Sequence, residues 1–209
     1  VNPEILHPKL DDQLEVYAAL QTLLDGAISD LGSGQGVVGP LDLSLNGNAQ
    51  AWIRVARTLK ARYYLHTAEV NPQAYTQALA QAQQGISSPA GDLTEYHSSA
   101  AGEENIWWQF IARDRDSYMR PGKFLVDLMK ARNDPRLPQY FSLNGFGEYN
   151  GAAPGEGLDA QLHSNLSPIR LDPAFRQPVV TWAENQAIIA EAAYRTGNTT
   201  LARQALDAL

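Results

Sequence analysis

The stretch from Trp52 to Ile86 constrains the fold most, because two amphipathic helices follow each other with one short break. Asn71-Pro72 marks the break, since proline has no amide proton to donate and disfavours helical angles in the residue before it. The small side chains of Ala78 and Ala82 allow the two helices to approach closely. The segment is therefore predicted to be a helical hairpin. Its apolar residues recur at three- and four-residue spacing: Ala56, Leu59, Tyr63, Leu65, Ala68, Tyr75, Ala78, Leu79, Ala82 and Ile86.

The first of these helices also carries a run of basic residues, which the helical spacing places largely opposite the apolar stripe. Such a run is typical of a face turned to solvent. The aromatic residues of the helices are instead predicted to pack inside a helical frame. The basic residues are Arg54, Arg57, Lys60 and Arg62, and the aromatic residues are Trp52, Tyr63, Tyr64, Trp182 and Tyr194.

The end of the chain repeats the arrangement. AEAAYRTGNTTLARQALDAL matches the tetratricopeptide pattern, in which small residues permit close helix packing and Gly197-Asn198 forms the turn. The predicted fold is mostly α, with tetratricopeptide-like hairpins at about 50–86 and 180–209 that form a scaffold. A long irregular insert at about 87–178, with a few short strands, completes a single domain over 1–209.

Other segments fit this plan. An apolar stripe predicts a helix over 12–31, Asn48 is placed to cap the helix that contains Trp52, and FLVDLMKA predicts a helix over 124–131. Residues 144–157 hold too much glycine and proline for regular structure, and a loop of that length tends to be functional or disordered. Gly32–Gly36 resembles a phosphate loop only superficially, because it follows a helix and lacks the GK[ST] ending.

Charge excludes one class of partner. The net charge of −7 and the pI near 5.0 argue against nucleic-acid binding, which requires an excess of clustered Lys and Arg. No apolar run approaches the length of a membrane span. The chain begins at Val1 and ends at Leu209 without a helix stop signal, so we expect a piece of a longer protein, with any targeting or anchoring segment outside it.

Segments at 59–69, 74–86, 134–141 and 175–198 together resemble the SusD/RagB family of surface nutrient-binding lipoproteins. The most specific match is FRQPVVTWAENQAIIAEAAYRTGN over 175–198, where a strand leads into a helix with an acidic residue and an AEA triplet. The order of the segments also agrees with the family. The other matching segments are LKARYYLHTAE over 59–69, AYTQALAQAQQGI over 74–86, and Asp134-Pro135-Arg136-Leu137 followed by Tyr140-Phe141.

The resemblance implies a mostly helical protein that binds an oligosaccharide or another nutrient without catalysis. It also implies a place on the outer-membrane surface, a lipid anchor outside this fragment, and a TonB-dependent, SusC-like transporter as partner. No cofactor is implied. The lipid-bearing cysteine and the C-terminal portion of such proteins are absent from the sequence, which fits a middle fragment.

Sugar recognition needs flat apolar faces for the ring carbons and planar polar groups for the hydroxyls. The insert supplies both kinds of side chain. Phe146 and Tyr149 are favoured because their glycine-rich loop has little else to bury them, whereas Trp107, Trp108 and Phe110 have a simpler interpretation as core residues. The candidate ligand-binding residues are Tyr96, Trp107, Trp108, Arg113, Tyr118, Phe146, Tyr149 and Asn150.

Two other functions remain open. Tetratricopeptide-like hairpins favour a module that binds proteins or peptides, and Glu103-Glu104 could supply the acid of a glycosidase, although adjacent carboxylates diverge on a helix. The scattered histidines do not predict a zinc site, there is no GxSxG motif, and the segment that begins at Asp114 lacks the glycine and glutamate of a calcium loop.

Overall fold

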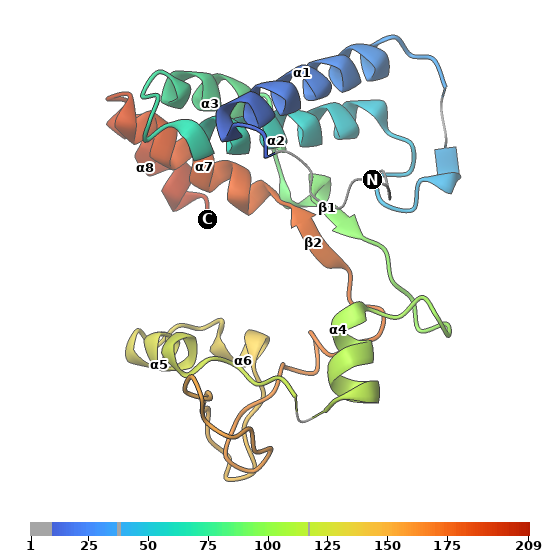
Figure 1. Ribbon diagram of the computed structural model, residues 1–209, viewed down its shortest axis with the longest axis vertical. Helices are drawn as coiled ribbons and strands as arrows, with labels where there is room; N and C mark the ends of the chain where they lie inside the picture. The colour runs from blue at the N-terminus through green and yellow to red at the C-terminus, as the bar shows by residue number, and fades with distance from the viewer. Residues whose placement is uncertain (1–9, 37–38, 117) are drawn as a thin grey trace. The chain divides into compact units, whose positions relative to one another are not determined.

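The computed structural model describes residues 10–36, 39–116 and 118–209. The chain forms two compact units: a helical unit, Val1–Thr94 with Pro178–Leu209, and an insert unit, Glu95–Gln177 (Figure 1). The prediction of a mostly α fold is confirmed, since the described residues form eight α-helices and one two-stranded sheet. In the described part, no helix is both long and apolar enough to cross a membrane.

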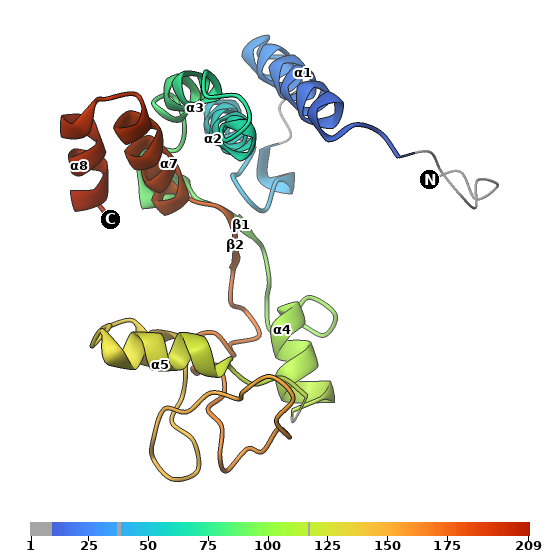
Figure 2. The ribbon, with the colours of Figure 1, turned by 60° about the vertical axis from the view of Figure 1, so that its left-hand side comes forward.

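The helical unit contains both expected hairpins. α2 (Ala49–Thr67) pairs with α3 (Ala74–Ala82), and α7 (Trp182–Arg195) pairs with α8 (Thr199–Asp207), while α1 (Gln13–Gly32) packs on α2 (Figure 2). α3 also contacts α7, so the two hairpins share one core. Small side chains dominate this core and allow the close approach predicted from the sequence: Ala61, Ala78, Ala82, Ile188, Ile189, Ala190, Ala192 and Ala205.

A buried polar cluster lies inside the same unit. The Nδ2 group of Asn185 donates to the carbonyl oxygens of Ala82, at 2.9 Å, and Ile86, at 3.1 Å. The hydroxyl of Thr58 donates to Oδ1 of Asn185 at 3.0 Å and accepts the amide proton of Ile86 at 3.1 Å. The side chain of Asn185 in α7 therefore joins α2 to the C-terminal end of α3 and the residues that follow it.

Two expectations about side chains on these helices are wrong. Lys60 is not on a solvated face, because it is only 2% exposed, lies beneath α1 and pairs with Asp25. Arg62 likewise pairs with Glu184 of α7 instead of pointing freely into solvent. Tyr194 does not pack in the core, since it is 66% exposed at the end of α7. Trp52 and Trp182 pack as predicted, against the cluster of Val55, Ile86 and Val180.

The turn before α2 is built around Asp42. Its carboxylate accepts the backbone N–H groups of Ser44, Leu45 and Gly47 and the indole N–H of Trp52, the last at 2.7 Å. Asn48 caps α2 as predicted, accepting from the amide of Ala51 at 3.0 Å. Burial would raise the pKa of Asp42, but the hydrogen bonds from Trp52 and the three amides outweigh it and lower the pKa to about 2.

We expect Asp42→Asn to lower the free energy of unfolding by about 1 kcal/mol at pH 7. The four N–H donors would then share one uncharged amide oxygen in place of the two oxygens of a carboxylate. The folded pKa lies below the ordinary value, so this contribution is present above pH 3.8 and is lost as the pH falls towards 2. Urea unfolding of both proteins across this range measures the difference. Asp30→Asn, at an exposed position of α1, is the control. A difference that does not shrink with falling pH would contradict the assignment.

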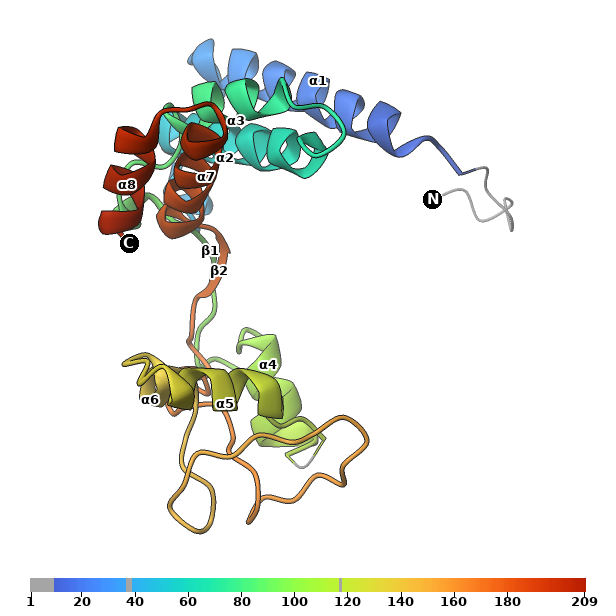
Figure 3. The same cartoon turned by 90° about the vertical axis from the view of Figure 1, so that its left-hand side faces the viewer.

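The insert unit combines short helices with long irregular segments (Figure 3). α4 (Ile106–Trp108) continues directly into a π-helix, η3 (Gln109–Asp114). α5 (Lys123–Ala131) and α6 (Leu137–Tyr140) enclose a small core of Val126, Met129, Leu137 and Phe141. The helix predicted over 124–131 is thus confirmed, and residues 144–157 contain no helix.

The remaining elements are short. β1 (Leu93–Glu95) pairs with β2 (Gln177–Val180), the strand expected before α7. η1 (Gly39–Leu41) and η2 (Pro89–Gly91) are single 3₁₀ turns. Whether residues 1–209 behave as one domain stays a prediction.

Candidate functional site

The insert unit holds a cavity of about 270 Å³, close to the lower end of the volumes of small-molecule sites, about 300 Å³. Its walls are mainly apolar and aromatic, with two guanidinium groups and two amides among them. The combination of a few polar groups with aromatic faces is typical of a binding site for a small polar molecule. The lining residues are Trp107, Ile111, Met119, Arg120, Pro121, Asn165, Leu166, Arg170, Phe175 and Gln177.

Asn105 positions one wall of this cavity. It is fully buried, and its Oδ1 caps α4 by accepting the amides of Trp107, at 2.9 Å, and Trp108, at 3.3 Å. The backbone N–H of Asn105 donates to the carbonyl oxygen of Pro173 at 2.7 Å, and its side-chain Nδ2 donates to the carbonyl oxygen of Phe175 at 3.0 Å. One side chain therefore holds the start of α4 against the segment that carries Phe175.

The π-helix that follows α4 carries Ile111, one of the residues that line the cavity. Its wider turn is closed by a bond from the amide of Arg115 to the carbonyl of Phe110 at 2.7 Å, and such turns occur frequently at functional sites. Trp107 and Ile111 both line the cavity, but Ile111 is buried whereas Trp107 is 42% exposed. The interpretation of Trp107 and Phe110 as simple core residues is therefore wrong, while Trp108 is half-buried.

Another part of the cavity wall is tied to α6. The hydroxyl of Ser167 donates to the carbonyl of Gln139 at 2.6 Å, and its amide donates to that of Tyr140 at 3.0 Å. Arg170 follows in the same segment, and its guanidinium carbon lies 4.1 Å from the ring centroid of Tyr140 and 5.6 Å from that of Phe175. Stacking on two rings fixes the guanidinium where it borders the cavity.

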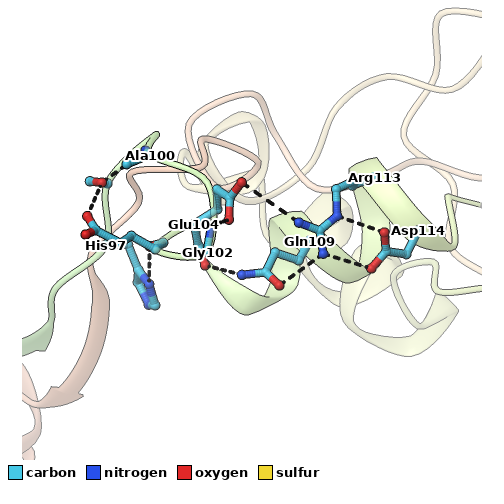
Figure 4. Close-up of polar contacts among 9 residues, drawn as sticks. His97, Ala100, Gly102, Glu104, Gln109, Arg113 and Asp114 are labelled. Carbon is cyan, nitrogen blue, oxygen red and sulfur yellow. Dashed lines mark hydrogen bonds and ion pairs between the residues drawn. The ribbon is translucent and has the colours of Figure 1, made fainter.

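Arg113, a candidate from the sequence, lies in a polar network next to α4 (Figure 4). Its Nε donates to Asp114 at 2.8 Å and its Nη2 to Gln109 at 3.2 Å, while Glu104 lies 3.9 Å from Nη1. The hydrogen bond from Arg113 lowers the pKa of the Asp114 carboxyl. Most of the donors of Arg113 are thus engaged within the protein, and it does not line the cavity.

The other candidates are spread over the insert unit. Tyr96, Tyr118 and Phe146 are exposed, Phe146 by 68%, and none of them lines the cavity. The guanidinium of Arg176 stacks on Tyr96, and that of Arg115 on Tyr118. The structure thus brings Trp107 alone of the sequence candidates to this cavity.

Tyr149 and Asn150 have structural contacts that the sequence did not reveal. Tyr149 is half-buried against the core of α5 and α6, so the expectation that its loop has little to bury it is wrong for this residue. Asn150 donates from Nδ2 to the carbonyl of Leu162 at 2.8 Å and borders a separate open hollow beside Lys123 and Glu156.

The glutamates considered for catalysis also make local contacts. Glu103 accepts the hydroxyl of Ser98 at 2.5 Å, and the buried Glu104 accepts the amide of Gly102 at 2.8 Å. Within the described ranges, no group of three or more His, Cys, Asp or Glu side chains is placed to hold a metal ion.

Comparison with solved structures shows the fold. A chitin-binding protein is 24% identical, with a TM-score of 0.78, and the match covers 96% of this chain and 48% of that one. A SusD/RagB family protein from Bacteroides thetaiotaomicron is 21% identical, with a TM-score of 0.80, over 99% and 46% of the two chains. A SusD homologue from Bacteroides uniformis is 22% identical, with a TM-score of 0.79, over 94% and 44%. The chain spans about half the length of these proteins.

No curated protein matches the sequence. A family model does match it, over residues 1–206, and that SusD-like family is described as starch-binding and associating with the outer membrane. This match covers almost the whole chain and agrees with the resemblance deduced from the segments at 59–69, 74–86 and 175–198. The chain therefore belongs to the SusD-like family.

Proposed function

We propose that this chain is part of a non-catalytic binding protein of the bacterial outer-membrane surface, which takes up an oligosaccharide or related nutrient and delivers it to a TonB-dependent transporter. The observation that carries the proposal is the half-exposed Trp107 at a cavity with guanidinium and amide groups. An indole face covers the C–H face of a sugar ring, while guanidinium and amide groups bond to its hydroxyls. Membership of a family described as starch-binding supports the same function.

Among the candidates from the sequence, Trp107 is proposed as the central contact. The exposed rings of Tyr96, Tyr118 and Phe146 are proposed as further contacts for a longer ligand, because exposed aromatic faces favour sugar stacking. Trp108, Arg113, Tyr149 and Asn150 are proposed to support the site indirectly, since their described contacts are made within the protein.

We expect Trp107→Ala to weaken binding to an oligosaccharide about tenfold, because a tryptophan at the centre of a site contributes more than the surrounding contacts. Isothermal titration calorimetry of the protein against a panel of neutral and acidic oligosaccharides gives the affinity. Phe124→Ala is the matched control, since it also removes an exposed ring of the insert unit but lies outside the cavity and outside the proposed contacts. Loss of binding in Phe146→Ala with unchanged affinity in Trp107→Ala would place the site on the loop instead.

The same preparations separate the competing functions. A glycosidase would release reducing sugar, and the activity would be lost in Glu103→Gln or Glu104→Gln. A peptide-binding module would capture soluble protein partners and bind no sugar in the panel. Delivery to a transporter is tested by co-purification from outer membranes, and recovery without any TonB-dependent transporter would contradict that part of the proposal.

A further inference from the structure

Two positive charges line the cavity, and none of the described lining residues is acidic. Arg120 and Arg170 are both half-buried there. Elsewhere in the insert unit, Arg113 and Arg136 pair with carboxylates. The ion pairs among the described residues include neither Arg120 nor Arg170. The cavity is therefore locally basic in a chain whose net charge is −7.

Arg120 also has unused hydrogen-bonding capacity. Its Nη1 donates to the carbonyl of Met119 at 3.3 Å, whereas its Nε is buried and has no hydrogen-bond partner among the described residues. A half-buried guanidinium has lost part of its hydration, so leaving its charge without an anion and its Nε–H without an acceptor is unfavourable. A bound anionic group would compensate this charge.

The second guanidinium is held in place. Arg170 stacks on Tyr140 and faces Phe175, and Ser167 ties its segment to α6. A fixed guanidinium loses little conformational freedom on binding and matches the two oxygens of a carboxylate or the oxygens of a sulfate. Trp107 and Phe175 supply apolar surface in the same cavity, which suits the ring that carries such a group.

We infer that this cavity recognises an anionic sugar residue, whose carboxylate or sulfate ester lies between Arg120 and Arg170 and whose ring lies against the aromatic wall. The inference rests on the proposed function, because it names the class of sugar bound at that same site. The volume of about 270 Å³ suits a single sugar ring. The net negative charge of the chain would repel an anion at long range, but salt screens that repulsion beyond about 8 Å.

The test compares matched ligands by calorimetry at physiological salt. They are an oligomer of a uronic acid, the methyl ester of the same oligomer, the corresponding neutral oligomer and a sulfated oligomer. We expect the uronate to bind at least about tenfold more tightly than its ester, since charge-assisted bonds are about twice as strong as neutral ones. A sulfated oligomer that exceeds the uronate would assign the site to sulfate esters. Equal affinity for acid, ester and sulfated oligomer would overturn the inference.

Variants test whether the preference for the anionic oligomer over its ester arises in this cavity. Arg120→Gln is expected to remove most of the discrimination between acid and ester, and Arg120→Lys to keep part of it, because lysine retains the charge without the planar fork. Arg132→Gln removes one exposed positive charge of the same unit outside the cavity and should preserve the discrimination. Circular dichroism and thermal unfolding establish that each variant is folded. Discrimination that survives in a folded Arg120→Gln protein would overturn the assignment to this cavity.

The outcomes also separate this inference from the proposed function. A protein that binds neutral oligomers through Trp107 but shows no preference for an anion retains the proposed function and loses the further inference. A protein that binds none of the four oligomers loses both.

Discussion

Replacing Asn185 with alanine is expected to lower the free energy of unfolding by about 3 kcal/mol, because the change leaves two buried polar groups without the partner that Asn185 provides and removes one of two hydrogen bonds from a third. The carbonyl oxygen of Ile86 loses the amide of Asn185, that of Ala82 keeps only the backbone amide of Gly85, and the hydroxyl of Thr58 loses its acceptor. Asn185 itself is 1% exposed, so water cannot replace these bonds without opening the core. Urea unfolding followed by circular dichroism measures the change.

A control and a second variant sharpen this test. Gln186→Ala changes the neighbouring, half-buried amide of the same helix and should alter stability by no more than about 0.5 kcal/mol. Thr58→Val removes the other side of the cluster, and its effect should add to that of Asn185→Ala less than fully, since the two residues share a hydrogen bond. Full additivity, or a loss of under about 0.5 kcal/mol in Asn185→Ala, would contradict the role of the cluster.

The same cluster explains why residue 85 is glycine. A Cβ atom there would lie closer to Oγ1 of Thr58 and to Oδ1 of Asn185 than van der Waals contact allows. Both neighbours are held by hydrogen bonds and have little freedom to move. Gly85 therefore makes room for the side chain of Asn185 from α7, which no local sequence pattern reveals.

Periodicity explains how much of the helical unit could be predicted. The hairpins follow from apolar spacing, the Asn71-Pro72 break and the Gly197-Asn198 turn, all of which act between residues close in sequence. Asn185 escaped this reasoning, because an amide between Glu184 and Gln186 resembles an ordinary solvated position. Its partners are about 100 to 127 residues away, and local pattern does not encode such a pairing.

The candidate site was less predictable for a similar reason. The sequence named Trp107 only as one of several aromatic residues of the insert, and it favoured a core position for that residue. The other cavity residues lie on segments without periodic pattern, around Arg120, Asn165–Arg170 and Phe175, so their convergence depends on tertiary contacts. One local signal was available: Asn105 precedes the aromatic helix at a capping position, and asparagine is a favoured cap.

Helical spacing predicted Lys60 on a solvent-exposed face, but its side chain is buried. A change at its ion-pair partner is expected to have the second large effect on stability. Its side chain is 3% exposed, and its ammonium lies 2.6 Å from the carboxylate of Asp25 and 3.4 Å from the carbonyl of Gln21. Asp25→Ala should therefore destabilise the protein by about 2 kcal/mol, because it leaves a buried ammonium with one long hydrogen bond. The value is below that of a fully buried pair, since the side chain of Asp25 is 63% exposed and solvent screens it.

Lys60→Met distinguishes the cost of an uncompensated charge from a benefit of the ion pair itself. Methionine keeps much of the packing of the lysine chain and removes the charge. The free energy of unfolding of Lys60→Met should therefore lie within about 1 kcal/mol of that of the wild type. In the Lys60→Met background, Asp25→Ala should then have almost no effect, because no buried charge remains to be compensated. Thermal and urea unfolding of the four proteins gives the coupling energy. An equal loss from Asp25→Ala in both backgrounds would show that the carboxylate stabilises α1 by another contact.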